Sequence, residues 1–280
     1  MSATRMVGVD GLSIHVADHG SVGDPVVLMI HGWPDTGNLW RHQVPALTGA
    51  GYRVLTPDTR GMGLSGRPAE VEGYRARTCV ADMIAVLDDA GTETAHVVAH
   101  DWGAAVGWGL AIGAPQRVRT LTALSVGHPN SFAAAGLRQL QRSWYMLLFQ
   151  FEGIAEEWLS ADDWAGFRRF MGGHPETERW IANLSGDGAL ESSLNWYRAN
   201  AHPSRLVAPS RPAVPCRVPT LGVWSDGDFA LTEQQMQNSG QYVEGPWRYE
   251  RIDGASHWIP LDAPDRLNGL LLEWLAQSST

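Results

Sequence analysis

The sequence predicts an α/β protein with a mostly parallel sheet, flanking helices and a helical insert, and three observations support this. In the first half, short apolar runs alternate with longer amphipathic segments, as in β–α units that build parallel sheets. From residue 130 to about 215 no strand-like run occurs and helical patterning dominates. Strand-like runs then return before a closing helix. The 280 residues suffice for one large core with such an insert.

The expected strands are short runs of apolar and β-branched residues between turn signals. Val26–Ile30 and Ala95–Ala99 are almost wholly apolar, which is typical of strands buried on both faces. The complete set of predicted strands is Ile14–Ala17, Val26–Ile30, Arg53–Pro57, Ala95–Ala99, Leu121–Val126, Thr220–Trp224 and Arg248–Ile252.

The expected helices of the sheet domain follow from apolar spacing. Thr78–Ala90 places Val80, Met83, Ile84 and Leu87 on one helical face. Ala104–Ile112 begins a helix rich in small residues, and Arg266–Ala276 is amphipathic and closes the chain.

The insert predicts a division into two domains. Residues 129–216 would form a helical cap, and residues 1–128 with 217–280 would form the core. The insert is rich in aromatic residues and ends in a connection marked by prolines at positions 203, 209, 212 and 215.

The composition argues against several classes of partner. Thirty acidic against 21 basic residues give a formal net charge of -9, and no basic block occurs, which disfavours nucleic acid and anionic membranes. Cys79 and Cys216 offer neither a disulfide framework nor metal-ligand spacing. Residues 1–20 lack the apolar stretch of a signal peptide, and no run approaches the roughly 18 apolar residues of a membrane span. We expect a soluble, cytoplasmic protein.

A candidate nucleophile lies at Asp101. Val97–Ala104 reads as a buried strand, a polar residue between small ones (Ala99, Gly103), and a helix start, which predicts a sharp strand-to-helix turn that exposes a nucleophile. The helix N-terminus favours an ionised carboxylate there. On this segment alone, Asp101 as an ordinary helix N-cap is an equal alternative.

Two further loops supply partners for Asp101. His257 follows a predicted strand near the C-terminus, and Asp228 follows another at Gly222–Phe229. The chain order of nucleophile, acid and histidine is the order used by serine-type triads on α/β sheets. A base activates water, and a carboxylate fixes its tautomer. Asp226 competes with Asp228 for the acid role.

The motifs resemble the α/β-hydrolase superfamily, and within it the soluble epoxide hydrolases and the related haloalkane dehalogenases. The resemblance runs from about residue 30 to 260, and the aspartate in the nucleophile turn is its specific part, because esterases and lipases have serine there. The matching segments are His31-Gly32-Trp33-Pro34, Asp58-Thr59-Arg60-Gly61-Met62-Gly63-Leu64-Ser65, His100-Asp101-Trp102-Gly103, Asp228 and His257.

The resemblance implies the α/β-hydrolase fold with a cap inserted after the sixth strand, and a covalent ester on Asp101 that water activated by His257 hydrolyses. The oxyanion donors would be the backbone N–H groups of Trp33 and Trp102. The Trp33–Pro34 bond resembles the cis peptide that this loop often carries, and His31 and Pro34 would shape the loop. No metal or organic cofactor is implied.

The leaving group separates the two chemistries. Opening an epoxide produces an alkoxide that must be protonated, for which tyrosine is suited; a halide needs only N–H donors. Tyr145 and Tyr197 occupy segments that resemble the two tyrosine-bearing segments of epoxide hydrolase caps. As an alternative, each could simply pack on an amphipathic helix. Trp102 occurs in both enzyme groups.

We therefore expect an epoxide hydrolase that converts an apolar epoxide and water to a vicinal diol, as a monomer or homodimer. A haloalkane or haloacid dehalogenase using the same aspartate is the alternative, although the haloacid type would have Arg in place of Trp102. A non-catalytic ligand-binding protein on this fold is the second. The tryptophans expected to line an apolar pocket are Trp33, Trp102, Trp144, Trp196 and Trp258.

Overall fold

The computed structural model describes residues 2–206 and 214–277 and contains an eight-stranded sheet in the order β1-β2-β4-β3-β5-β6-β7-β8. β1 pairs antiparallel with β2, and β2 antiparallel with β4, whereas the neighbours from β4 to β8 are all parallel. The strands are β1 (Ser2–Val9), β2 (Leu12–His19), β3 (Val26–Ile30), β4 (Arg53–Pro57), β5 (Ala95–His100), β6 (Val118–Leu124), β7 (Thr220–Gly227) and β8 (Trp247–Ser256).

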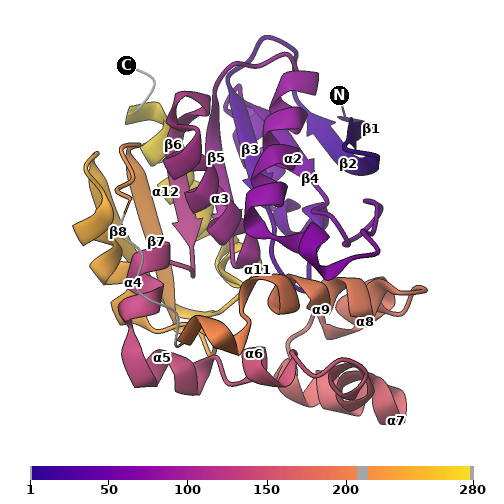
Figure 1. The fold of residues 1–280 in the computed structure, drawn as a ribbon. Helices are drawn as coiled ribbons and strands as arrows, with labels where there is room; N and C mark the ends of the chain where they lie inside the picture. The colour runs from indigo at the N-terminus through magenta and orange to yellow at the C-terminus, as the bar shows by residue number, and fades with distance from the viewer. Residues whose placement is uncertain (1, 207–213, 278–280) are drawn as a thin grey trace.

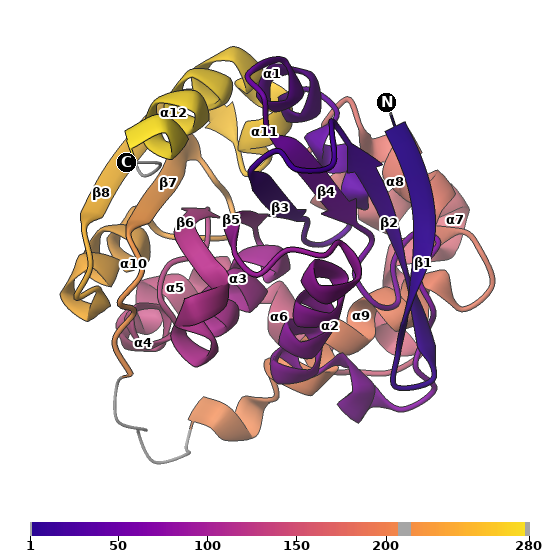
Figure 2. The same cartoon turned by 90° about the horizontal axis from the view of Figure 1, so that it is seen from above.

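Helices cover both faces of the sheet (Figures 1 and 2). Seen from above, α2 (Ala76–Asp89) and α3 (Trp102–Gly113) lie on one face, and α1 (Gln43–Gly49) and α12 (Pro264–Gln277) on the other. Two short helices, α10 (Glu233–Gln237) and α11 (Ile259–Asp262), follow β7 and β8. Short 3-10 helices span Gly37–Trp40, Val71–Tyr74, Pro115–Arg117, Pro203–Leu206 and Asn238–Tyr242.

The helical insert, α4 to α9, lies between β6 and β7, as the sequence predicts. Figure 1 shows α6, α7, α8 and α9 beyond the ends of the strands, where they cover one edge of the sheet. Residues 161–164 interrupt α7 with non-helical backbone. The connection after the insert includes Pro209 and Pro212, which lie outside the described residues. The helices are α4 (Pro129–Ala134), α5 (Gly136–Arg142), α6 (Tyr145–Leu148), α7 (Ile154–Phe170), α8 (Thr177–Leu184) and α9 (Ala189–Asn200).

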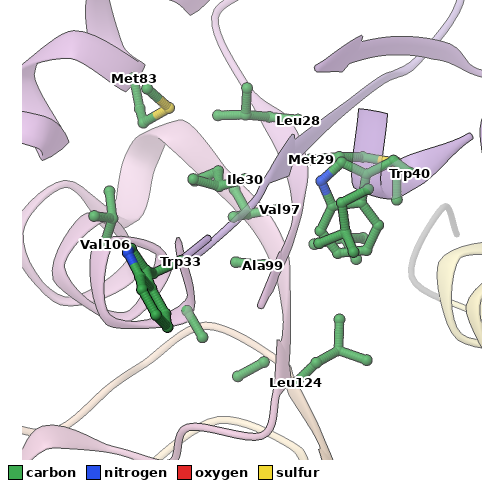
Figure 3. Packing of buried hydrophobic residues seen from close by; sticks show 14 of the residues in the cluster. Leu28, Met29, Ile30, Trp33, Trp40, Met83, Val97, Ala99, Val106 and Leu124 are labelled. Atoms are coloured by element: carbon green, nitrogen blue, oxygen red, sulfur yellow. The ribbon is translucent and has the colours of Figure 1, made fainter. Parts of the chain in front are cut away.

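The core follows from the apolar strands at the centre of the sheet. Every residue of β3 and β5 is buried, which requires packing on both faces. Because side chains alternate along a strand, successive residues of β3 serve opposite layers. Figure 3 shows Met29 and Trp40 on one side of β3 and Ile30 on the other. The central strands are thereby held rigidly, and so are the loops that follow them.

Several elements differ from the prediction. β1, α1, α10 and α11 were not predicted from the sequence. The sixth strand spans Val118–Leu124 instead of Leu121–Val126. Its start was not predicted because the exposed, charged Arg119 interrupts the apolar pattern there. In the described parts of the chain, no helix combines the length and apolar character that a bilayer crossing needs.

Candidate active site

Four loops meet at the carboxyl edge of the parallel strands. Trp33 follows β3, Asp101 follows β5, Asp228 follows β7 and His257 follows β8. Because these strands are parallel, their carboxyl ends share one edge of the sheet, where α/β proteins bind ligands. Residues far apart in the sequence are therefore brought together by the sheet order.

Asp101 forms the sharp turn that the sequence predicts. Its backbone has φ of 53° and ψ of -123°, between the end of β5 and the start of α3. Positive φ is costly for a residue with a side chain and is characteristic of functional turns. Asp101 makes no side-chain cap hydrogen bond to α3, which argues against the N-cap alternative.

Glycine allows this turn to approach the neighbouring loop. A Cβ added to Gly103 would lie 2.2 Å from the carbonyl oxygen of Ile30 and 2.5 Å from that of His31. A Cβ at Gly32 would lie 2.4 Å from Asp101 Oδ1. The loops after β3 and β5 therefore touch through backbone atoms.

We expect Gly103→Ala to lower the free energy of unfolding by roughly 1–3 kcal/mol, because the added methyl group overpacks rigid backbone. Chemical denaturation measures this. Gly113→Ala, at the other end of α3, is the matched control and should leave stability unchanged or slightly raised, because a Cβ there meets nothing within 4 Å. Equal stability of Gly103→Ala and the native protein would contradict the close approach.

The surroundings of Asp101 favour its charged form. The Trp33 N–H donates to Asp101 Oδ1 at 2.9 Å, and Asp101 Oδ2 lies 3.6 Å from His257 Nε2. Burial acts to raise the pKa of Asp101, but hydrogen bonding and the charge of His257, with the Trp102 N–H, outweigh it and lower that pKa. The buried carboxylate is therefore ionised and available as a nucleophile.

His257 bridges the two carboxylates. Its Nδ1 lies 2.9 Å from Asp228 Oδ2, and Asp228 Oδ1 accepts the N–H groups of Ala230 and Leu231 at 2.8 and 2.9 Å. Asp226, the competing acid, instead accepts the Gly254 N–H at 2.8 Å. The structure thus brings Asp228, and not Asp226, to the histidine.

The two carboxylates stabilise the protonated form of His257. Burial acts to lower the pKa of His257, but Asp228 and Asp101 together raise it to about 10. In the same region, burial lowers the pKa of His100 to about 4, so this second imidazole stays neutral. Its Nε2 lies 2.9 Å from the His257 carbonyl oxygen.

The start of the loop after β3 is fixed by two hydrogen bonds of the His31 imidazole. His31 Nδ1 lies 2.9 Å from the Gly32 carbonyl oxygen, and His31 Nε2 accepts the Thr59 N–H at 2.9 Å. The Trp33–Pro34 peptide bond is cis. These contacts orient the Trp33 N–H toward Asp101.

A small cavity of about 10 Å³ opens on the carboxylate and the histidine. Tyr145 from α6 and Tyr197 from α9 are buried in its wall, and their ring centroids lie 5.9 Å apart. Burial is the main cause that raises the pKa of both tyrosines well above the usual value, so both hydroxyls remain proton donors. The residues that line the cavity are Trp33, Asp101, Tyr145, Phe170, Tyr197, Phe229, Ala230, His257 and Trp258.

The tryptophans expected in the pocket divide into three groups. Trp33 and Trp258 line the cavity just described. Trp33, Trp102 and Trp196 line a second small cavity, also of about 10 Å³, together with Gly32, Thr59 and Met62. Trp144 borders neither cavity; it is 51% exposed on the insert surface.

Sequence reasoning missed three lining residues, Phe170, Phe229 and Ala230. Phe229 and Ala230 follow Asp228 directly in the sequence, so their position next to the predicted acid could have indicated that they lie at the site. Phe170 ends α7, whose interruption breaks the helical periodicity that would have indicated its face.

Comparisons with known proteins identify the family of this chain. Residues 25–264 match the α/β-hydrolase fold family. The chain belongs to this family. Epoxide hydrolase A of Mycobacterium tuberculosis is 32% identical, over 97% of this chain and 96% of that protein. An AB hydrolase superfamily protein of Bacillus subtilis is 31% identical over 97% of both chains. The crystal structure of epoxide hydrolase A from Mycobacterium thermoresistibile is 29% identical, with a TM-score of 0.84 over 99% of this chain and 98% of that one. These α/β-hydrolase relatives span nearly the whole chain.

Proposed function

We propose that this chain is an epoxide hydrolase that converts an apolar epoxide to a vicinal diol through an ester on Asp101. The observation that carries the proposal is that Tyr145 and Tyr197 line the same cavity as Asp101 and His257. A nucleophile and two phenolic donors in one cavity are what opening an epoxide requires, because one atom attacks carbon while another group protonates oxygen. The relatives named epoxide hydrolases support the assignment.

The first step forms the ester. Asp101 Oδ2, the oxygen that faces His257, attacks an epoxide carbon, and the carbon–oxygen bond breaks. One of the two tyrosines gives its proton to the departing oxygen, and the other donates a hydrogen bond to it. Asp101 Oδ1 remains on the Trp33 N–H as the ester carbonyl oxygen.

The second step hydrolyses the ester. Ester formation removes the Asp101 charge, which is one of the causes that raise the pKa of His257, so that pKa falls. The imidazolium then gives its proton to solvent, and the neutral imidazole is a base for water; His257 takes a proton back from solvent when Asp101 is ionised again. Water attacks the carboxyl carbon, charge develops on Oδ1, and the N–H groups of Trp33 and Trp102 bind it. Collapse releases the diol, whose new hydroxyl takes the proton from His257, and the Asp101 carboxyl proton returns to the tyrosinate.

A role for residues 129–216 as a cap domain over a core of residues 1–128 and 217–280 is part of this proposal. The insert supplies both phenolic donors, and α9 joins it to the core because Trp33 Nε1 donates to Ser193 Oγ at 3.0 Å. The wall of aromatic residues fits an apolar, aryl-bearing substrate. Cys79 and Cys216 are buried free thiols, which supports a cytoplasmic location.

A dehalogenase is the second candidate, and one observation favours it. The Trp102 Nε1 is buried and, apart from the Tyr197 hydroxyl, has no hydrogen-bond partner among the described residues, so it could donate to a halide. The Trp33 Nε1, in contrast, is already bonded to Ser193. The Trp33 and Trp102 indole N–H groups are therefore not both free to bind a halide.

Product analysis tests the proposal. We expect purified protein to convert an aryl epoxide to its diol, and Tyr145→Phe/Tyr197→Phe to lose about 10²–10³-fold in rate, because general acid catalysis is removed. Tyr249→Phe is the matched control, since this hydroxyl bonds Glu233 on the core, and it should retain full activity.

A short bromoalkane is offered in parallel. Bromide release without diol formation, unaffected by loss of the tyrosines, would make the protein a dehalogenase. No product from either substrate, with saturable binding of the epoxide, would favour the non-catalytic alternative.

A further inference from the structure

The insert contacts the loop after β3, which carries the Trp33 N–H, through a partly buried ion pair that the reaction above does not use. Arg179 Nη2 on α8 donates to Asp35 Oδ1 at 3.0 Å. Asp35 is 1% exposed, whereas Arg179 is 25% exposed. The charge that compensates this core carboxylate is therefore held by the insert.

Asp35 belongs to the turn that presents the oxyanion donor. Its N–H donates to the Gly32 carbonyl oxygen at 3.0 Å and closes the turn around Trp33. The Trp33 N–H in turn donates to Asp101 Oδ1 at 2.9 Å. We therefore expect a displacement of the Asp35 side chain to move the Trp33 N–H.

Arg179 is itself held in place by neighbouring charges. Its Nε bonds Glu176, and Glu176 also pairs with Arg41 of the core at 2.7 Å. Asp35 depends on this arrangement, because Arg179 supplies the positive charge from the insert, and its other contact from α8 is the neutral Trp180 indole. A buried carboxylate that loses its cation must protonate or move toward water. Even with Arg179 present, burial keeps the pKa of Asp35 above its usual range.

We propose that Arg179 is a positioning residue that acts through Asp35 to hold the Trp33 N–H against Asp101 Oδ1. The inference rests on the proposed function for its kinetic meaning. The two half-reactions depend differently on this donor. During ester formation Asp101 loses charge, so a weaker donor does not slow the attack. During hydrolysis charge develops on Oδ1, so a weaker donor slows that step.

The kinetic test uses Arg179→Met with an aryl epoxide. We expect kcat to fall by about 10-fold, because a misplaced donor loses part of the 10²–10³-fold that one such donor contributes. KM should fall with it, so kcat/KM stays within about two-fold, and rapid quench should find more enzyme as ester. Arg179→Lys, which keeps the charge, should recover most of kcat.

Arg168→Met is the matched control, because Arg168 pairs with Asp163 and Glu178, which both belong to the insert. The Arg168→Met variant should leave kcat and KM unchanged. Native kinetics in Arg179→Met, or a fall in kcat/KM as large as that in kcat without ester accumulation, would overturn the proposal. The latter would mean a general loss of active protein.

A second measurement does not depend on activity. Amide hydrogen exchange of the peptide that contains residues 31–36 should accelerate in Arg179→Met and stay native in Arg168→Met. Unchanged exchange in Arg179→Met would overturn the positioning role even if kcat fell. If the native protein makes no diol, the proposed function fails, and the exchange result still decides whether Arg179 holds the loop.

Discussion

Replacing His257 with glutamine is expected to stop turnover after one ester has formed on each molecule. Ester formation needs the Asp101 carboxylate and a phenolic donor, whereas hydrolysis needs a base, and His257 is the imidazole that faces the carboxylate at 3.6 Å. General base catalysis contributes about 10²–10⁴-fold, so steady-state diol formation should fall by about 10³-fold. Mass spectrometry of the variant after incubation with an aryl epoxide should show the protein mass increased by one epoxide.

The control for this variant is His202→Gln, which removes an exposed imidazole that bonds Ser204. It should turn over at the native rate and show no adduct. The adduct in His257→Gln should also vanish when Asp101→Asn is added. Loss of turnover without any adduct would mean that His257 is needed before the ester forms, contrary to the two-step order.

Asp101→Asn should abolish diol formation altogether. The amide keeps the shape of the carboxylate, and asparagine is among the residues that tolerate positive φ, so the turn should survive. Its amide is a very poor nucleophile, and loss of a nucleophile that acts with its base costs about 10⁴–10⁶-fold. Initial rates on an aryl epoxide, with thermal unfolding as the check on folding, measure this.

Asp226→Asn is the matched control, because Asp226 is partly exposed and bonds the Gly254 N–H beside the site. It should retain the native rate. Substantial diol formation by Asp101→Asn would show that water attacks the epoxide directly, and the ester mechanism would be wrong.

The sheet could be predicted from the sequence where burial is complete. Val26–Ile30 and Arg53–Pro57 are found with the predicted bounds, and every residue of both strands is buried. Val26–Ile30 is a continuous apolar run, which leaves little choice of structure. β1 was missed because it is an edge strand whose one deeply buried apolar side chain is Val7. Its pattern lacks the regular apolar alternation of a half-buried strand.

The candidate site, too, could be predicted from the sequence only in part. The turn at Asp101 has a local signal, since small residues, a strand and a helix adjoin it, and the cis bond at Trp33–Pro34 agrees with the resemblance. The pocket wall has no such signal. Trp144 and Phe170 are both aromatic residues of the insert, but Trp144 lies on the surface and Phe170 in the cavity. Only the packing of the helices decides which aromatic side chain lines the cavity and which lies on the surface.

The pair Arg179–Asp35 lay beyond sequence reasoning for a related reason. The partners are 144 positions apart, and neither belongs to a catalytic motif. A charge pair across two elements is set by their docking, which no local pattern encodes.

The origin of the reacting groups bears on how this protein can diversify. The carboxylate, the base and the oxyanion donors come from strands that the whole fold depends on, whereas Tyr145 and Tyr197 come from an insert between β6 and β7. In the proposed mechanism, the bond to be opened is thus chosen by one part of the chain and the resulting ester is turned over by another. We therefore expect that substitutions in the insert can redirect the reaction to a new leaving group while ester turnover is kept, so that a change of reaction does not require a new catalytic core.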